Sequence, residues 1–417
     1  MNKIQKKSFW ALMVTQFFGA FNDNVLKVLV TLLIVQWVED EGMQQQLVDL
    51  SGAIFVAQFL LFSMVAGRLA DRTGKPTVIM ATKFWELLVV TVAILSLWAK
   101  SIPFMMAALF LLSTQAAFFS PAKYGVVPEL MGEEEISRGN GWLNMGTFAA
   151  ILMGTIIASF LTNSLITASV MMLAASLAGL AASHFMEPLP AAKPGEKWAW
   201  DPLQDLVANW KLMSQDRALR LGGVAVNYFW FIGAVFQLNI FLYAKQMMDA
   251  SDQVSGVLAC SLMVGVVLGS FIAGQISGKR VELGLVPLGA LGMSLFAIDL
   301  LWAYHFKIRL LSDLFLLGIS AGFYDIPLTA LVQWRSPPGE RGRILATINF
   351  FSFIAILAAS GVLWMMHAVL ELDPAQVFFY LGVVSLAGTA IFCAAFPDIR
   401  ERFVLMLRRC LPKEPLI

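Results

Sequence analysis

Long apolar runs, separated by short polar connections, make up most of this chain. Twelve runs are about 20 residues or longer, the length that an α-helix rising about 1.5 Å per residue needs to cross a hydrocarbon layer of about 30 Å. The pattern predicts an all-α membrane protein with twelve spanning helices, at residues 9–37, 47–69, 76–98, 101–120, 142–162, 164–186, 220–246, 253–277, 284–305, 310–332, 343–367 and 375–396.

The composition supports this prediction. Of 417 residues, 59% are hydrophobic and 14% are charged, whereas soluble domains have about 45–50% and about 25%. A formal net charge of +1 gives no reason to expect a nucleic-acid partner. Three scattered cysteines suggest neither a disulfide framework nor a metal site, and no Walker-type loop or membrane acyltransferase motif occurs. We expect no catalytic residues and no cofactor.

The basic residues predict the orientation of the spans. Of 29 Lys and Arg residues, 23 fall in segments that are cytoplasmic if the N-terminus is inside, and two lie within spans. Cytoplasmic loops carry the excess of positive charge in membrane proteins. Both termini should therefore be cytoplasmic, with only four basic residues outside: Lys100, Lys245, Lys307 and Arg309.

The longest connection divides the chain into three predicted regions: a six-helix bundle at 1–186, a linker at 187–219, and a second bundle with a tail at 220–417. Asp201 and Pro202 are typical of a helix start, and apolar residues follow at helical spacing. We expect an amphipathic helix along the cytoplasmic interface that ties the halves together. A solvated linker is the alternative.

The two halves contain similar motifs in the same order. The segment 19–24 has a looser counterpart at 233–239. Ser120-Pro121 is followed 23 residues later by Asn144, and the segment 323–327, which ends in Pro327, is followed 22 residues later by Asn349. Parallel six-helix repeats of this kind handle substrate near the bilayer midplane.

Several ionisable residues lie inside predicted spans, where a charge costs at least about 2.5–3.5 kcal/mol and must face a partner or a wet cavity. Asp23 and Lys27 are four residues apart and so share one helical face. We favour a substrate or coupling role for them over a self-satisfied structural pair. Lys83 and Glu86, three residues apart, are expected to neutralise each other instead.

Two further charges lie beside prolines. Lys123 follows Ser120-Pro121, where the fourth span must bend or end, so it is either a site residue or an interfacial charge. Asp325 precedes Pro327 in the tenth span. Asp299, in the ninth span, is expected to be structural.

The connection between the second and third spans carries the sequence Gly-Arg-Leu-Ala-Asp-Arg-Thr-Gly-Lys at 67–75. It resembles, position by position, the signature of the major facilitator superfamily, which implies the major facilitator fold and a cytoplasmic latch made in the outward-open state. Asp71 should accept hydrogen bonds from a neighbouring helix N-terminus, whose dipole favours an anion. The alternative is that the loop charges only set topology. The latch residues are Gly67, Arg68, Asp71, Arg72, Gly74 and Lys75.

A closer resemblance rests on three stretches, at 16–24, 120–125 and 324–333. Together they resemble the lysophospholipid transporters of bacterial inner membranes, over essentially the whole chain. In that family Asp23 and Lys123 match residues implicated in handling the lipid headgroup, whereas Asn144 stands where members often have Glu. The candidate substrate site is therefore Asp23, Asn24, Lys27, Lys123, Asn144 and Asp325.

The resemblance implies a monomeric carrier, surrounded by membrane lipids, that moves lysophosphatidylethanolamine to the inner leaflet. There a cytoplasmic acyltransferase-synthetase would restore the diacyl lipid. Taken alone, the charged residues leave two other functions open. One is a proton-coupled exporter of drugs or other small molecules, and the other is a noncatalytic scaffold for a lipid-remodelling enzyme.

Overall fold

The computed structural model describes residues 3–132, 134–162, 164–195, 201–278 and 281–410. These residues form α-helices and one 3₁₀ turn, with no strand among them. The helices are α1 (Lys3–Trp37), α2 (Glu41–Arg72), α3 (Lys75–Trp98), α4 (Ile102–Met131), α5 (Ile136–Leu161), α6 (Leu165–Ser183), α7 (Pro202–Gln215), α8 (Arg217–Met248), α9 (Asp252–Ser277), α10 (Leu285–Ala303), α11 (Lys307–Arg335), η1 (Pro338–Glu340), α12 (Arg341–Ala368), α13 (Pro374–Ala395) and α14 (Pro397–Cys410).

Twelve of these helices are long and apolar enough to cross a membrane, namely α1 to α6 and α8 to α13. The predicted all-α membrane fold is therefore confirmed, with six spans on each side of α7. The predicted ends agree with the observed ones to within a few residues for most spans, because the polar residues between the apolar runs supply helix caps. Asp40 and Asp373, for example, cap the N-termini of α2 and α13.

The fourth span is longer than expected. It was predicted to bend or end near Pro121, but α4 continues through Pro121 and Pro128 to Met131. Proline removes one backbone hydrogen bond, and a helix in a membrane protein tolerates this where neighbouring helices surround it. Lys123 consequently lies inside a helix and is buried.

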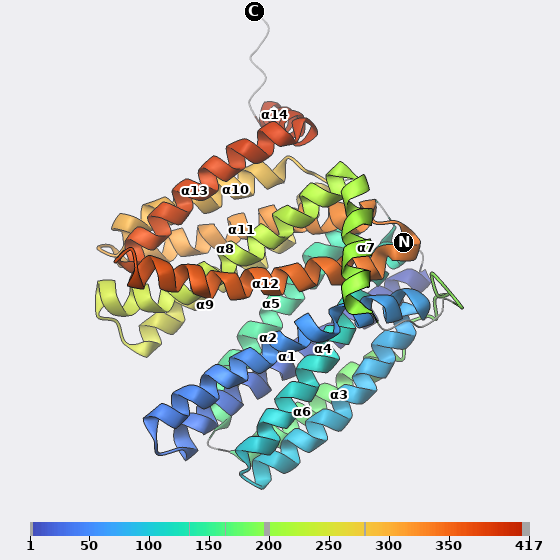
Figure 1. Cartoon of the computed structure of the whole chain (residues 1–417), viewed down its shortest axis with the longest axis vertical. Coiled ribbons are helices and arrows are strands. Elements are labelled where there is room, and N and C mark those ends of the chain that lie inside the picture. The colour runs from blue at the N-terminus through green and yellow to red at the C-terminus, as the bar shows by residue number, and fades with distance from the viewer. Residues whose placement is uncertain (1–2, 133, 163, 196–200, 279–280, 411–417) are drawn as a thin grey trace, which may run out of the picture. The chain divides into compact units, whose positions relative to one another are not determined.

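The chain forms two compact units. Unit 1 comprises residues 1–133, 146–220 and 332–354, and unit 2 comprises residues 134–145, 221–331 and 355–417. In unit 1, α1 packs against α4 and α6, and α3 packs against α4 and α6 (Figure 1). Its apolar core is formed by α1, α3, α4, α5 and α6. In unit 2, α10 runs beside α13, and α14 continues past the end of α13 (Figure 1).

Glycines allow two helices of unit 2 to approach closely. Gly265 and Gly269 in α9 face Gly318 and Gly322 in α11, and a Cβ at any of these positions would meet the backbone of the other helix. Small residues four apart are typical of close helix packing in membranes, where dispersion contacts take the place of the hydrophobic effect. This contact holds α11, and with it Asp325, against the body of unit 2.

The predicted linker helix is present as α7. Asp201 caps it by accepting a hydrogen bond from the Gln204 N–H at 2.9 Å, and Pro202 is its first residue. Its Asn209 donates to Thr347 of α12 at 3.1 Å. Leu203 and Val207 are exposed on another part of its surface. The helix is therefore amphipathic, with one face docked on unit 1 and an apolar face left uncovered by the described residues.

Candidate functional site

Asp23 lies in the middle of α1 among other buried charges. Its side chain is half-buried, and its Oδ1 atom is fully covered yet has no hydrogen-bond partner among the described residues. Lys83, Glu86 and Lys123 are all close enough to act on this carboxyl group electrostatically. One oxygen of this carboxylate therefore has charged neighbours but accepts no hydrogen bond from any residue that the structure describes.

Lys27 does not pair with Asp23. Its Nζ lies 4.7 Å from the centroid of the Phe55 ring in α2, a cation–π contact, and no carboxylate of the described residues lies within ion-pair distance. The alternative of a self-satisfied Asp23–Lys27 pair is therefore not what the structure contains. The shared helical face places the two residues near each other, but the lysine side chain extends toward the ring.

Lys123 has a similar environment. It is buried in α4, with its Nζ 4.3 Å from the Tyr124 ring centroid and 5.9 Å from that of Phe119. Like Lys27, it makes no ion pair with another described residue. Two ammonium groups of unit 1 thus lie over aromatic rings and form no ion pair with a described residue, and a buried charge without an ion pair is costly.

Lys83 and Glu86 form the local ion pair that the sequence predicted. Asn22, which the sequence analysis did not single out, joins this pair: its amide donates to Glu86 at 3.4 Å and to the Met172 carbonyl of α6 at 3.1 Å. A Cβ at Gly19 would meet the Lys83 ammonium, so any larger residue there would have to displace the end of this lysine side chain. The pair ties α1, α3 and α6 together and is neutral overall.

Asn144 and Asp325 come together in unit 2. The Asn144 Nδ2 of α5 donates to the Asp325 Oδ2 of α11 at 2.7 Å, and Thr329 donates to the Asp325 Oδ1 at 3.2 Å. Both oxygens of this buried carboxyl group therefore have partners. Asn24, by contrast, donates to the Ala20 carbonyl of its own helix at 2.8 Å.

A matching contact occurs in unit 1. Asn349 of α12 donates to the Ser120 hydroxyl of α4 at 2.8 Å. The repeat in the sequence already related Asn349 to Asn144 and Ser120-Pro121 to the segment that contains Asp325, although neither Asn349 nor Ser120 was chosen as a site residue. Their significance appears only when the helices are assembled.

The signature loop caps a helix, as predicted. The Asp71 Oδ1 accepts a hydrogen bond from the Gly342 N–H at 2.7 Å, and its Oδ2 accepts one from the Arg343 N–H at 2.9 Å. These N–H groups belong to the first turn of α12, where four N–H groups lack partners within the helix. A Cβ at Gly67 would lie 2.5 Å from the Ala346 Cβ, so glycine is what lets α2 and α12 approach this closely.

The remaining loop residues bind other parts of unit 1. Arg68 forms an ion pair with Asp205 of α7, and Lys75 pairs with Glu129 of α4 at 2.5 Å. Gly74 is packed against the Leu189 carbonyl, and Arg72 is the last, half-buried residue of α2. The loop therefore connects α2 to α4, α7 and α12 rather than extending into solvent.

A second ion pair, at the other end of the linker helix, joins Asp216 to Arg335 at 2.9 Å. Partial burial would by itself raise the pKa of Asp216. The hydrogen bond from Arg335 and those from the backbone N–H groups of Leu219 and Ala218 outweigh this effect, so the pKa of Asp216 is below its ordinary value. This carboxylate is ionised at neutral pH and holds α11 to the start of α8.

No cluster of three potential metal ligands occurs within the described ranges. In unit 2, Asn144 and Asp325 bind each other. The candidate site of unit 1 consists of Asp23, Lys27 and Lys123, and its charges of both signs suit a ligand that carries both an anion and a cation. It offers no nucleophile with an adjacent base.

Comparison with known proteins supports the fold and the transport class. A sequence model of the Major Facilitator Superfamily matches residues 10–360. The lysophospholipid transporter LplT of Enterobacter sp. (strain 638) is 28% identical over 363 residues, covering 85% of this chain and 88% of that protein. LplT of Klebsiella pneumoniae is 27% identical over 399 residues, covering 93% of this chain and 95% of that protein.

Solved structures agree on the architecture at much lower identity. The human organic anion transporter MFSD10 superposes with a TM-score of 0.73 at 16% identity, covering 97% of this chain and 100% of that one. The transporter FucP, in an outward conformation, gives a TM-score of 0.74 at 14% identity, covering 94% and 98%. At these identities the likeness concerns the fold alone.

Proposed function

This chain belongs to the major facilitator superfamily and is a membrane transporter, and we propose that its substrate is a lysophospholipid of the phosphatidylethanolamine type. The proposal is that the lipid moves to the inner leaflet by alternating access and is then reacylated. The observation that carries it is the set of charges in unit 1 that lack a direct partner among the described residues. Lys27 and Lys123 form no ion pair and lie over aromatic rings, and the covered Oδ1 of Asp23 accepts no hydrogen bond.

The headgroup of this lipid would satisfy these charges. Its phosphate needs a cation, which Lys123 or Lys27 offers, and its ammonium needs an anion, which Asp23 offers. A buried ion without a partner destabilises a protein by about 3–5 kcal/mol. Binding of a zwitterion would remove part of that cost for both the acid and the lysines. A simple cation would pair only with Asp23, and a simple anion only with Lys27 or Lys123. The relatives named as lysophospholipid transporters support the same assignment.

Alternating access requires a contact that forms and breaks, and Asp71 is the residue we assign to it. Its hydrogen bonds from the Gly342 and Arg343 N–H groups join α2 to α12. This contact lies at the end of unit 1 that we propose to be cytoplasmic. We propose that these bonds are made when the carrier is open to the outside and are lost when it opens inward. Arg68 and Lys75 then keep the loop in place through Asp205 and Glu129.

The proposed setting is a bacterial inner membrane with both termini in the cytoplasm. A monomer is sufficient for this mechanism, because each candidate residue lies in one chain. A cytoplasmic acyltransferase-synthetase is the proposed partner reaction, since a lysolipid delivered to the inner leaflet needs a second acyl chain to become a bilayer lipid again.

One observation also favours a second function. A buried carboxyl group without a hydrogen-bond partner, such as Asp23 at its Oδ1, is what a proton-coupled exporter would use to bind a proton. An exporter of this kind would move cationic drugs outward in response to a proton gradient. It would not discriminate lysolipids by headgroup.

Reconstitution tests the proposal directly. Purified protein is inserted into vesicles, labelled lysophosphatidylethanolamine is added outside, and inward movement is measured as resistance to extraction by albumin. We expect movement with the wild type, a loss of at least tenfold with Asp23→Asn, and no change with Glu39→Gln, an exposed acid in the connection between α1 and α2. Absence of lipid movement combined with proton-driven uptake of a cationic dye would support the exporter. Absence of both, with a folded protein, would support the scaffold.

A further inference from the structure

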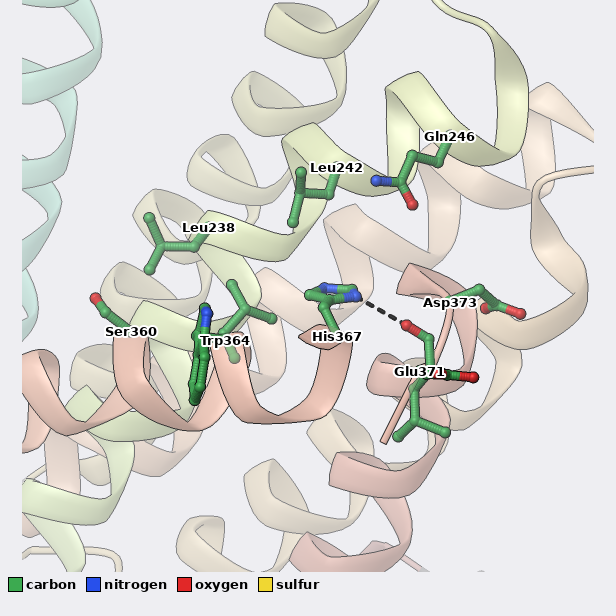
Figure 2. A pocket seen from close by; sticks show the side chains of 10 residues that line it. Leu238, Leu242, Gln246, Ser360, Trp364, His367, Glu371 and Asp373 are labelled. Atoms are coloured by element: carbon green, nitrogen blue, oxygen red, sulfur yellow. Dashed lines mark hydrogen bonds between the residues drawn. The ribbon is translucent and has the colours of Figure 1, made fainter. Parts of the chain in front are cut away.

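Unit 2 contains a groove between α8 and α12 that the proposed transport site does not use. Its volume is about 900 Å³, within the range of about 300–1,000 Å³ that is typical of small-molecule sites. Figure 2 shows Leu238, Leu242 and Gln246 extending from α8 toward Trp364 and His367 of α12. The three α8 residues are four apart and so share one face of that helix.

The walls of the groove are apolar. Leu238, Leu242, Leu363 and Trp364 line it. Trp364 is 66% exposed and Leu238 is 44% exposed, so both side chains have large uncovered surfaces. An acyl chain lying along α8 would cover them through close dispersion contacts.

The polar end of the groove is a fixed turn. The His367 Nδ1 lies 2.8 Å from the Leu372 carbonyl oxygen, the contact drawn in Figure 2, and its Nε2 lies 3.2 Å from the Asn239 Oδ1. Asn239 in turn donates to the Pro374 carbonyl at 2.8 Å. These bonds attach the turn after α12 to α8, so the residues that the turn carries have set positions.

The turn carries acidic residues to the end of the groove. Glu371 has a φ of 53°, a left-handed conformation that few residues other than glycine adopt, and its side chain is among those lining the groove. Asp373 is occupied as the N-cap of α13. Glu371 makes no ion pair with any other residue that the structure describes. The Glu371 carboxylate is therefore available to a cationic ligand.

We propose that this groove binds one lysophospholipid with an ammonium headgroup, as a first site before the charges of unit 1. The inference rests on the proposed function. The single acyl chain lies against Leu238, Leu242 and Trp364, and the ammonium meets the Glu371 carboxylate. The ten lining residues include two acids and no lysine or arginine, so the groove selects for a cationic group. In the proposed topology this end of α8 and α12 faces the outside, where the substrate begins its path.

Photo-crosslinking tests this site on the full chain. The probe is lysophosphatidylethanolamine with a diazirine in its acyl chain, added to the purified protein in nanodiscs, and the adducts are mapped by mass spectrometry. We expect adducts at 238–246 and 360–372. Glu371→Gln should lower their yield at least fivefold, and Leu238→Trp, which fills the groove, should do the same. Glu39→Gln, the same change at another exposed acid, should leave the yield unchanged, and unlabelled lysophosphatidylglycerol, which lacks the ammonium, should compete poorly.

Each outcome has a separate meaning. Adducts spread over the lipid-facing surface, or an unchanged yield in both Glu371→Gln and Leu238→Trp, would overturn the groove site. If the wild type moves lysolipid in vesicles but the groove is unlabelled, the proposed function stands and this inference fails. If the groove is labelled but the wild type moves no lipid, the binding site stands and the proposed function fails.

Discussion

Two equivalent places in the repeated helices make the same contact with different chemistry. In unit 2, Asn144 of α5 donates to the carboxyl group of Asp325 in α11. In unit 1, Asn349 of α12 donates to the hydroxyl group of Ser120 in α4. Both acceptors lie just before a proline within a helix. The repeat has therefore kept the geometry of the contact while its charge has changed.

The charge is distributed differently along the two proline-containing helices. In α4 the contact itself is neutral and a cation, Lys123, lies one turn further along. In α11 the contact contains the anion, and Leu328 occupies the position one turn further along. A charge with a hydrogen-bonded partner stabilises the fold, whereas a charge with only aromatic neighbours is available to a ligand. The comparison therefore separates a structural anion from a cation suited to binding.

The sequence repeat behind these two contacts predicts that both halves enter the membrane from the same side, and a failure of this prediction would have the largest effect. Because the repeats are parallel and the basic residues favour the cytoplasm, reporters fused after Lys193 and at the C-terminus should both be cytoplasmic. A reporter inserted near Asp40 should be external. Activity of alkaline phosphatase and green fluorescent protein fusions distinguishes the two sides. An opposite signal at any one of these points would contradict the twelve-span arrangement.

Removing the charge from α4 tests the comparison between the two proline-containing helices next. Lys123→Gln should lower the rate of lysolipid movement about 10- to 100-fold, because a hydrogen bond to a charged group is worth about 1.5–3 kcal/mol and about 1.4 kcal/mol is a factor of ten. The protein should remain folded, since the lysine has no ion pair to lose. Leu328→Met, an apolar change at the matching buried position of α11, should have little effect on the rate. Equal effects of both variants would show that Lys123 is not a ligand-binding charge.

The Asn144–Asp325 contact should contribute more to stability than the Asn349–Ser120 contact. Both variants leave an asparagine amide without its acceptor. Asp325→Ala removes a bond to a charged group, worth about 1.5–3 kcal/mol, from the buried Asn144, whereas Ser120→Ala removes a neutral bond worth about 0.5–1.5 kcal/mol from the half-buried Asn349. Thermal unfolding in detergent measures the difference as a larger fall in Tm for Asp325→Ala. The double variant Asp325→Ala/Asn144→Ala should recover part of the loss. A larger fall for Ser120→Ala would reverse the assignment.

The latch offers the smallest expected effect. Asp71→Asn keeps one acceptor for the Gly342 N–H but removes the charge matched to the N-terminus of α12, an interaction of about 0.3–1 kcal/mol and at most about 2 kcal/mol. We expect normal insertion and transport slowed severalfold, measured in the same vesicles. Arg335→Gln, which breaks an ion pair of unit 1 outside the signature loop, serves as the control. Transport at the full rate in Asp71→Asn would show that the loop only sets topology.

Some features could be predicted because their signals are local in sequence. The four-residue spacing of Asp23 and Lys27, the glycine-rich loop with Asp71, and the cap at Asp201 each depend on residues within one helix or turn. Asn22, Ser120 and Asn349 were missed as site residues because their partners are 64, 229 and 229 positions away. An uncharged polar residue in an apolar helix carries little signal until its partner is known.

The sequence by itself determined the twelve spans and the identity of the charges inside them, because length, apolar content and helix caps act over a few turns of chain. Only the tertiary structure decided which charges are satisfied. It placed Lys27 over Phe55 and not on Asp23, and it gave Asp325 two hydrogen-bond donors. The physical reason is that a buried charge is stabilised by atoms within a few ångströms, and in a helical membrane protein those atoms come mostly from helices that are distant in the sequence.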